Sequence, residues 1–77
     1  MLSTFKRRYL IIKYLVNVVN NETRSIQDIR SHLLTTYKDD CSIRMIQRDM
    51  VYLRDDFDEV KVEINNGLEY LYYFSVD

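Results

Sequence analysis

The 77-residue sequence predicts an α+β fold in which three helices are followed by a β-hairpin. Up to residue 57, apolar residues recur three or four positions apart, as on one face of a helix. After Val60 the pattern changes to alternation of apolar and charged residues, which is typical of a strand with one buried face. Asn66-Gly67 then separates this strand from a second one and indicates a hairpin turn. A chain of this length forms a single small domain, spanning residues 1–77.

The composition describes a globular domain without a metal or catalytic centre. Apolar residues make up 47% of the chain, which is enough to form a core and argues against disorder. One cysteine, Cys41, and one histidine, His32, supply neither an internal disulfide nor a four-ligand zinc site. The sequence also lacks a glycine-rich phosphate loop and a nucleophile–base motif. We therefore expect no enzymatic activity, no metal and no cofactor.

The sequence carries no targeting or membrane segment. No basic-then-apolar leader opens it, and no apolar run approaches the ~20 residues of a membrane span. The single cysteine fits a reducing compartment. We expect a cytoplasmic protein without membrane contact, associated with the nucleoid if its source is prokaryotic.

Charge is divided unevenly along the chain, although the net charge is only −1. Residues 1–54 carry ten Lys or Arg and five Asp or Glu. Residues 55–77 carry one Lys and seven Asp or Glu. Such asymmetry indicates an electrostatic surface on one side of the domain, and here the basic part is the helical part.

The first helix is expected over residues 4–19, with Ser3 or Thr4 as its N-cap. Leu10 and Tyr14 lie four positions apart on the side predicted to face outward, where they are either a dimer contact or two scattered surface residues. The residues expected to face the core, a face that Ile11 and Val18 widen, are Phe5, Tyr9, Ile12, Leu15, Val16 and Val19.

The second helix is expected to begin at Ser25. Asn20-Asn21 ends the first helix, because Asn tolerates the left-handed conformation that closes a helix. Ser25 and Asp28 then have the spacing of a capping box, with Asp in place of the usual Glu. Residues 37–40 form the polar break after this helix. Its predicted buried stripe consists of Ile26, Ile29, Leu33 and Tyr37.

The third helix, over about 42–54, has two unlike faces. Ser42 is a suitable N-cap, and Cys41 with Ile46 has the spacing of a hydrophobic staple. A short turn joins this helix to the second, as in a helix-turn-helix. The apolar stripe comprises Ile46, Met50, Leu53 and Phe57, and the opposite face Arg44, Gln47, Arg48, Val51 and Tyr52.

A β-hairpin completes the domain. Val60, Val62 and Ile64 alternate with charged residues in the first strand, and Asn-Gly accepts positive φ at both central positions of a tight turn. The second strand is expected over 68–76 and is dense in aromatic residues. Three helices followed by a hairpin form a winged helix-turn-helix.

The third helix and the hairpin resemble the N-terminal DNA-binding domain of DeoR-type and WYL-domain transcriptional regulators. That family shows Ser, a basic residue, Thr, Ile, any residue, Arg, Asp and Leu, followed by a further Leu. Met50 is a near match to the family's Leu after Arg-Asp. Ser25 with Ile29 and Leu33 is similar to the family's second helix. The matching residues are Ser42, Arg44, Ile46, Arg48, Asp49 and Leu53. The resemblance implies a DNA-binding winged helix.

Two departures from the family pattern affect the expected interface. Met45 replaces the family's Thr in the first turn of the third helix. The hairpin carries Glu63 and Glu69, whereas a wing that touches DNA carries Arg or Lys. Because carboxylates repel phosphates, we expect the wing to stay away from DNA and to complete the core or form an interface.

The predicted DNA-binding residues lie on the third helix and at the start of the second. Recognition helices contact bases from their N-terminal residues, so Arg44 and Gln47 are predicted to read bases and Arg48 to contact phosphate. The helix N-terminus at Ser25 offers backbone N–H groups to a phosphate. The full set is Ser25, Ser42, Ile43, Arg44, Met45, Gln47, Arg48 and Tyr52.

Two charged residues of the third helix could form ion pairs within the domain instead of taking part in function. Arg48 has Asp28 or Asp39 as possible salt-bridge partners within the domain. Asp49 lies at the edge of the buried stripe, so we assign it to a structural ion pair rather than to any chemistry.

These features predict a regulator of transcription that binds double-stranded DNA, most simply a repressor, with the third helix in the major groove. We expect a homodimer on a palindromic site and infer no small-molecule effector. The alternative is a winged-helix module for protein–protein interaction that uses the acidic hairpin, which would then mimic nucleic acid.

Overall fold

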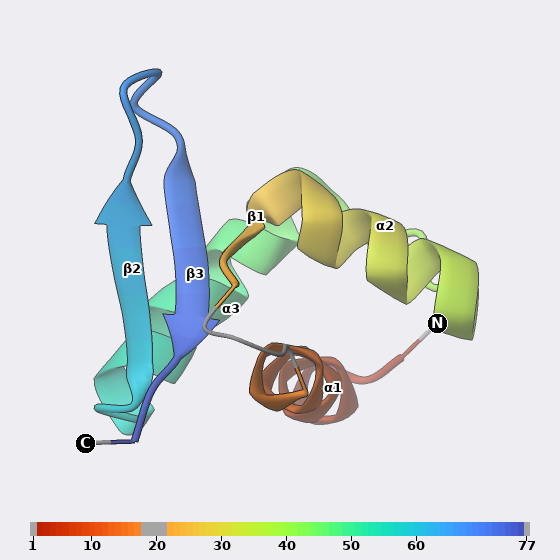
Figure 1. Ribbon diagram of the computed structural model, residues 1–77. Helices are drawn as coiled ribbons and strands as arrows, with labels where there is room; N and C mark the ends of the chain where they lie inside the picture. The colour runs from red at the N-terminus through yellow and green to blue at the C-terminus, as the bar shows by residue number, and fades with distance from the viewer. Residues whose placement is uncertain (1, 18–21, 77) are drawn as a thin grey trace.

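The structure, a computed structural model, describes residues 2–17 and 22–76 and confirms the predicted fold class (Figure 1). The β2–β3 hairpin stands at one side of the molecule, and the helices lie beside it. The elements are α1 (Thr4–Val16), β1 (Arg24–Ser25), α2 (Ile26–Tyr37), α3 (Ile43–Asp56), β2 (Val60–Ile64) and β3 (Tyr70–Phe74). Within the described residues, none of these helices is long and apolar enough to cross a membrane.

The sheet is antiparallel, with β3 in the centre and the strand order β1-β3-β2. Tyr72 is the central residue of this arrangement, because it is opposite Val62 on β2 and opposite Arg24 on β1. Strand β1 is not among the elements predicted from the sequence, because its two residues are too few to show alternation. Because β1 runs directly into α2, its pairing attaches the helix-turn-helix to the wing.

The second helix begins and ends as the sequence predicts. Ser25 and Asp28 form the expected capping box, in which each side chain accepts a hydrogen bond from the other residue's backbone N–H. Lys38 closes the helix in the left-handed conformation, with φ of 58°. Residues 38–42 then lead to α3, so that α2 and α3 form a helix-turn-helix.

The core lies between the three helices and the inner face of the sheet. The predicted stripes of α2 and α3 are confirmed, except that Phe57 caps the end of α3 and is 42% exposed. Cys41 and Ile46, the predicted staple, are both buried. The buried apolar residues are Leu10, Ile11, Leu15, Ile29, Leu33, Cys41, Ile46, Met50, Leu53, Val60 and Tyr72.

The predicted orientation of α1 is wrong. Leu10, expected to face outward, is buried, whereas Phe5, Tyr9 and Val16, expected in the core, are exposed. Ile11 and Leu15 are buried as expected. Apolar residues occupy most of the circumference of this helix, so their spacing alone does not select the buried face. The face of α1 that is buried is determined by Arg7, which lies on the same side as Ile11 and pairs with a carboxylate of α3.

The correction removes the dimer contact predicted at Leu10 and Tyr14. Leu10 is in the core, and the Tyr14 ring stacks on the His32 ring of α2 with 3.9 Å between centroids. Both residues therefore pack within the domain. Ser3 is the N-cap as predicted, but α1 ends at Val16 rather than at residue 19. The predictions for Val18, Val19 and Asn20-Asn21 lie outside the described residues.

The hairpin is confirmed, but its turn differs from the predicted one. Gly67 does not have positive φ; Leu68 has, at 62°. The Asn65 side-chain oxygen accepts hydrogen bonds from the N–H groups of Gly67 and Glu69, each at 2.9 Å. The loop thus closes on a left-handed residue, a position that glycine normally occupies in three-residue hairpin loops.

Candidate nucleic-acid interface

The two faces of α3 point in opposite directions, as the sequence predicts. One face enters the core with Ile46, Met50 and Leu53. Its outer face exposes Arg44, Gln47, Arg48, Val51 and Tyr52. The remaining predicted contacts of the first turn, Ile43 and Met45, are half-buried beside the exposed Ser42.

A buried ion-pair network fixes α3 against α1. Two nitrogens of the Arg7 guanidinium donate to the two carboxylate oxygens of Asp49, and Arg8 Nε donates to Asp49 Oδ1 at 2.9 Å. The Arg7 and Asp49 side chains are only 4% and 1% exposed. These hydrogen bonds raise the pKa of Arg7, since the carboxylate favours the charged guanidinium. The structural ion pair predicted for Asp49 is confirmed.

A second carboxylate contributes to this electrostatic environment. Asp39, in the turn between α2 and α3, is buried, and its negative charge also favours the charged form of Arg7 and raises its pKa. Neither of its carboxylate oxygens has a hydrogen-bond partner within the described residues. The Arg7 charge is therefore balanced by Asp49 in the middle of α3 and by Asp39 in the turn that precedes this helix.

Arg8 also reaches the outer face of α3. Its guanidinium carbon lies 4.2 Å from the centroid of the Tyr52 ring, a cation–π contact. Tyr52, a predicted DNA contact, is thus held from the side by α1 while its ring stays half exposed. The contact places a fixed aromatic ring at the edge of the outer face.

Arg44, Gln47 and Arg48 are free of side-chain hydrogen bonds and ion pairs within the described part of the chain. The alternative partners of Arg48 are occupied differently: Asp28 accepts from Ser25 N–H at 3.0 Å, and Asp39 is buried. The outer face of α3 therefore presents two cationic side chains and one amide to the solvent.

At Ser25, where the sequence predicts a phosphate contact, the side chain and the backbone N–H are both engaged within the domain. Its side chain is buried and accepts from Asp28 N–H at 3.1 Å. Its own N–H donates to the Asp28 carboxylate, which places a negative charge at the start of α2. A phosphate at this position would be repelled. Ser42, by contrast, is exposed while it caps α3 through Met45 N–H at 3.2 Å.

A cleft of about 510 Å³ separates α3 from the wing. Gln47, Val51 and Arg54 of α3 line one side, and Glu69 and Tyr70 of the hairpin line the other. The α3 wall therefore carries one amide and one cation beside apolar side chains, while the wall formed by the wing carries an aromatic ring and a carboxylate. This arrangement fits a ligand that follows α3 more closely than the wing.

The roles of Arg7 and Arg8 are not among the predictions made from the sequence. A signal was present, because Arg7 shares helical spacing with the apolar Leu10 and Ile11, while Asp49 shares it with Ile46 and Met50. Opposite charges within two apolar stripes indicate a buried pair between the helices. Tyr52 and Arg8, in contrast, are joined only by the crossing of α1 over α3.

Comparisons with known proteins add no further constraint. Neither models of known protein families nor curated proteins gave a match to this sequence. Within the described residues, no group of three or more His, Cys, Asp or Glu side chains is arranged to hold a metal ion.

Proposed function

We propose that this chain is a sequence-specific regulator of transcription that binds double-stranded DNA and inserts α3 into the major groove. The observation that carries the proposal is the unpaired outer face of α3. Arg44, Gln47 and Arg48 are exposed and have no side-chain partner in the described residues, while Asp49 fixes the opposite face in the core. Such a helix presents donors to a ligand without first losing bonds of its own.

Each of these side chains suits a particular contact. Arg44 lies in the first turn of α3, where recognition helices contact base edges, and an Arg guanidinium pairs with the O6 and N7 atoms of guanine. Gln47 is one turn further along and matches adenine N6 and N7. Arg48 has the reach of a phosphate contact. The resemblance of this segment to DeoR-type regulators supports the same assignment.

The simplest regulatory mechanism is repression, because a domain bound across a promoter excludes polymerase. Two copies on a palindrome would read half-sites one helical turn apart, about 34 Å. This function places the protein with the DNA, in the cytoplasm, and in the nucleoid if its source is prokaryotic. The wing carries Glu63 and Glu69, so α3 supplies most of the contacts.

The deciding experiment is a salt titration of duplex binding. Duplexes selected from a random pool are titrated with the chain at several salt concentrations, and binding is followed by fluorescence anisotropy. Each phosphate contact contributes a slope of about −0.9 in log K against log salt. Arg48→Ala should lower affinity for all duplexes and reduce this slope by about one contact. Lys61→Ala, on the sheet, is the matched control.

A protein-interaction module is the second candidate, favoured by the chemistry of the wing. Ile64, Leu68 and Tyr70 are exposed beside Glu63 and Glu69, an acidic and apolar surface that suits a basic protein partner. The same titration separates the two candidates. If duplex binding is absent, or does not respond to salt or to Arg48→Ala, the DNA assignment is overturned. The protein-interaction module that uses the wing is then favoured.

A further inference from the structure

The guanidinium of Arg8 is held in place by two contacts with α3. Its Nε donates a hydrogen bond to Asp49 Oδ1 at 2.9 Å, and its carbon lies 4.2 Å from the centroid of the Tyr52 ring. Asp49 belongs to the buried side of α3, whereas Tyr52 is half exposed on the outer side. A guanidinium that lies over an aromatic ring keeps its N–H donors, because the ring occupies only its face. Arg8 is therefore oriented while most of its donors stay unused.

The two terminal nitrogens of Arg8 remain available to a ligand. Neither has a hydrogen-bond partner within the described part of the chain, and neither is among the buried atoms that lack one. The Arg8 side chain is 27% exposed, so these nitrogens reach the solvent. Together they form a fork of N–H donors, which matches two oxygens of a phosphate. The fork is in position before any ligand arrives.

Arg8 lies beside one particular edge of α3, the edge that faces α1. Arg48 and Tyr52 are four positions apart and therefore lie on one line along the helix. The contact of Tyr52 with Arg8 shows that this line faces α1. The opposite edge, with Gln47 and Val51, lines the cleft toward the wing. The α1 edge therefore presents two cations, Arg48 and Arg8, next to the Tyr52 ring.

One acid, Asp56, lies on the same edge. It lines the groove that Arg8 also lines, but no ion pair joins the two within the described residues. Asp49, which holds Arg8, precedes Asp56 by seven residues, a rise of about 10 Å along a helix. Asp56 therefore lies beyond the level at which Arg8 meets α3, and it leaves the fork of Arg8 free for an anion.

The edges of a helix in the major groove face the phosphate backbones. An α-helix with its side chains is about 10–12 Å wide, and the groove is about 12 Å wide. The outermost residues of the helix thus meet base edges, while residues along its two sides lie next to phosphates. Of the two edges of α3, the wing edge has Glu69 beside it, whereas the α1 edge has Arg8 and Arg48.

We propose that Arg8 of α1 contacts a DNA phosphate on the strand that passes the α1 edge of α3, next to the phosphate contacted by Arg48. This inference rests on the proposed function and adds α1 to the interface. Tyr52 is then a positioning residue, because its ring holds the guanidinium of Arg8. Asp49 has two roles: its bonds to Arg7 fix α3, and its bond to Arg8 directs the fork toward the strand.

A salt titration of duplex binding tests the charge of Arg8. Arg8→Met keeps an unbranched apolar side chain but removes the donors and the charge. Affinity for every duplex should fall by about tenfold, and the slope of log K against log salt should decrease by about 0.9, the value of one phosphate contact. The selected base sequence should not change, because a phosphate carries no sequence information. A slope equal to that of the unaltered chain would overturn the proposal.

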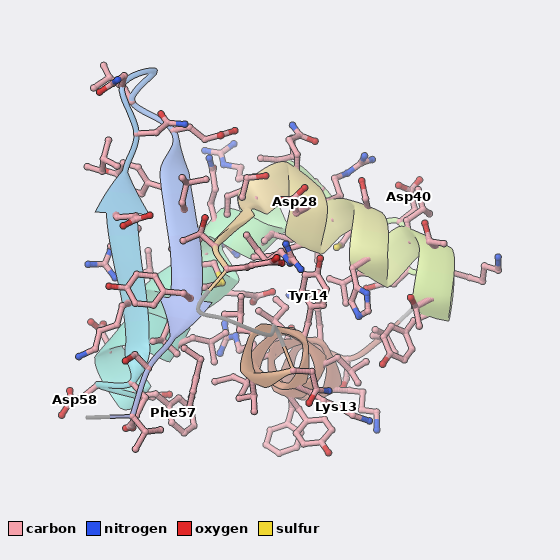
Figure 2. The ribbon with its side chains drawn as sticks, viewed as in Figure 1. Lys13, Tyr14, Asp28, Asp40, Phe57 and Asp58 are labelled. Carbon is pink, nitrogen blue, oxygen red and sulfur yellow. The ribbon has the colours of Figure 1, made fainter. Side chains whose placement is uncertain are left out.

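Lys13→Met is the matched control, since it removes one positive charge from the same helix. Lys13 is exposed, and Figure 2 shows Lys13 and Phe57, the residue that caps α3, on opposite sides of α1. Its slope should stay close to that of the unaltered chain. Circular dichroism checks that both variants are folded during the titration; Arg7 still pairs with Asp49 in Arg8→Met. An equal decrease of slope in both variants would indicate an effect of net charge alone and would also overturn the proposal.

Neutral phosphate analogues separate a direct contact from an effect on the fold. Each duplex of a series carries one methylphosphonate, which lacks the negative charge, at a different position of one strand. The unaltered chain should lose affinity at the phosphate that Arg8 contacts, whereas Arg8→Met should be insensitive to the analogue at that position. Arg48→Ala should become insensitive at a neighbouring position of the same strand. If Arg8→Met stays as sensitive as the unaltered chain at every position, Arg8 does not contact phosphate.

A double-variant cycle tests the positioning role of Tyr52. Tyr52→Leu removes the ring that holds Arg8 and should lower affinity in the unaltered chain. The same change should lower it less in Arg8→Met, because the group that the ring positions is already absent. Losses that add in full would show that Tyr52 does not act through Arg8.

Failure of the Arg8 contact is distinct from failure of DNA binding as a whole. Duplex binding that Arg48→Ala weakens and Arg8→Met leaves unchanged would remove Arg8 from the interface and keep the proposed function. Absence of duplex binding by the unaltered chain would overturn both.

Discussion

The guanidinium of Arg7 and the carboxylate of Asp49 form a buried two-point ion pair that joins α1 to the middle of α3. The pair fixes the rotation of α3 about its own axis, because Asp49 shares the inward face with Ile46 and Met50. The direction of the outward side chains follows from that rotation. A contact on the core side therefore determines which residues α3 presents to a ligand.

Asp49→Asn should destabilise the fold by about 3–5 kcal/mol, because it leaves the buried Arg7 charge without its counterion. Chemical unfolding followed by circular dichroism measures this change. Asp55→Asn, an exposed position on the same helix, is the control and should change stability little. Replacing the pair with Arg7→Met and Asp49→Leu together should recover part of the loss. Equal stabilities for the two single variants would contradict a structural role for Asp49.

Gln47→Ala should alter sequence preference more than overall affinity. Gln47 projects from the outer face of α3 and has the donor–acceptor pair that matches adenine. We expect a loss of about 1–3 kcal/mol at one base position, with binding to other sequences largely retained. Parallel selections of duplexes by the unaltered chain and by the variant would reveal the relaxed position. Selection of the same consensus by both would remove Gln47 from the reading residues.

Leu68→Gly should stabilise the hairpin, whereas Gly67→Ala should be tolerated. Leu68 has φ of 62°, and a left-handed non-glycine residue costs about 1–2 kcal/mol, partly offset by the flexibility of glycine in the unfolded chain. Gly67 lacks positive φ, and an added Cβ would meet only the Asn65 side-chain oxygen, at 3.4 Å. Thermal unfolding measures both changes. A marked loss in Gly67→Ala would indicate the turn expected from the sequence instead.

Stability should fall on acidification between pH 7 and 5 because of His32. Burial against Tyr14 lowers the pKa of His32 from its ordinary value of 6.5. The unfolded chain therefore binds the proton more readily, and this contribution is fully present above pH 6.5 and decreases below it. His32→Phe keeps a ring for stacking but cannot titrate. Its melting temperature should depend less on pH over this interval; an identical dependence would contradict the assignment.

The sequence predicts most of the fold because its helices carry local signals. The capping box at Ser25 and the N-cap at Ser42 depend on residues within one turn and were found at the predicted positions. The apolar stripes of α2 and α3 are equally distinct, since polar residues occupy their other faces. These elements also define the outer face of α3, so the position of the candidate interface was predictable.

Other features depend on contacts between distant segments. The orientation of α1 follows from Arg7 pairing with a residue 42 positions away, because apolar residues around most of the helix leave its buried face undetermined. The pairing of β1 with β3 involves only two residues of β1, which have no periodicity of their own. In the wing, Asn65 bonds to the N–H groups of Gly67 and Glu69, so the left-handed position shifts to Leu68.

In α3 the exposed side chains and the side chains that hold the fold lie on opposite faces, and this has an evolutionary consequence. Changes at Arg44, Gln47 and Arg48 leave the ion pair of Asp49 and the packing of Ile46 and Met50 intact. Their replacement should therefore carry little penalty in folding. Under the proposed function, a lineage of such chains can acquire new target sequences by drift at these three surface positions. The same property makes this short helix a scaffold on which libraries of altered specificity can be built.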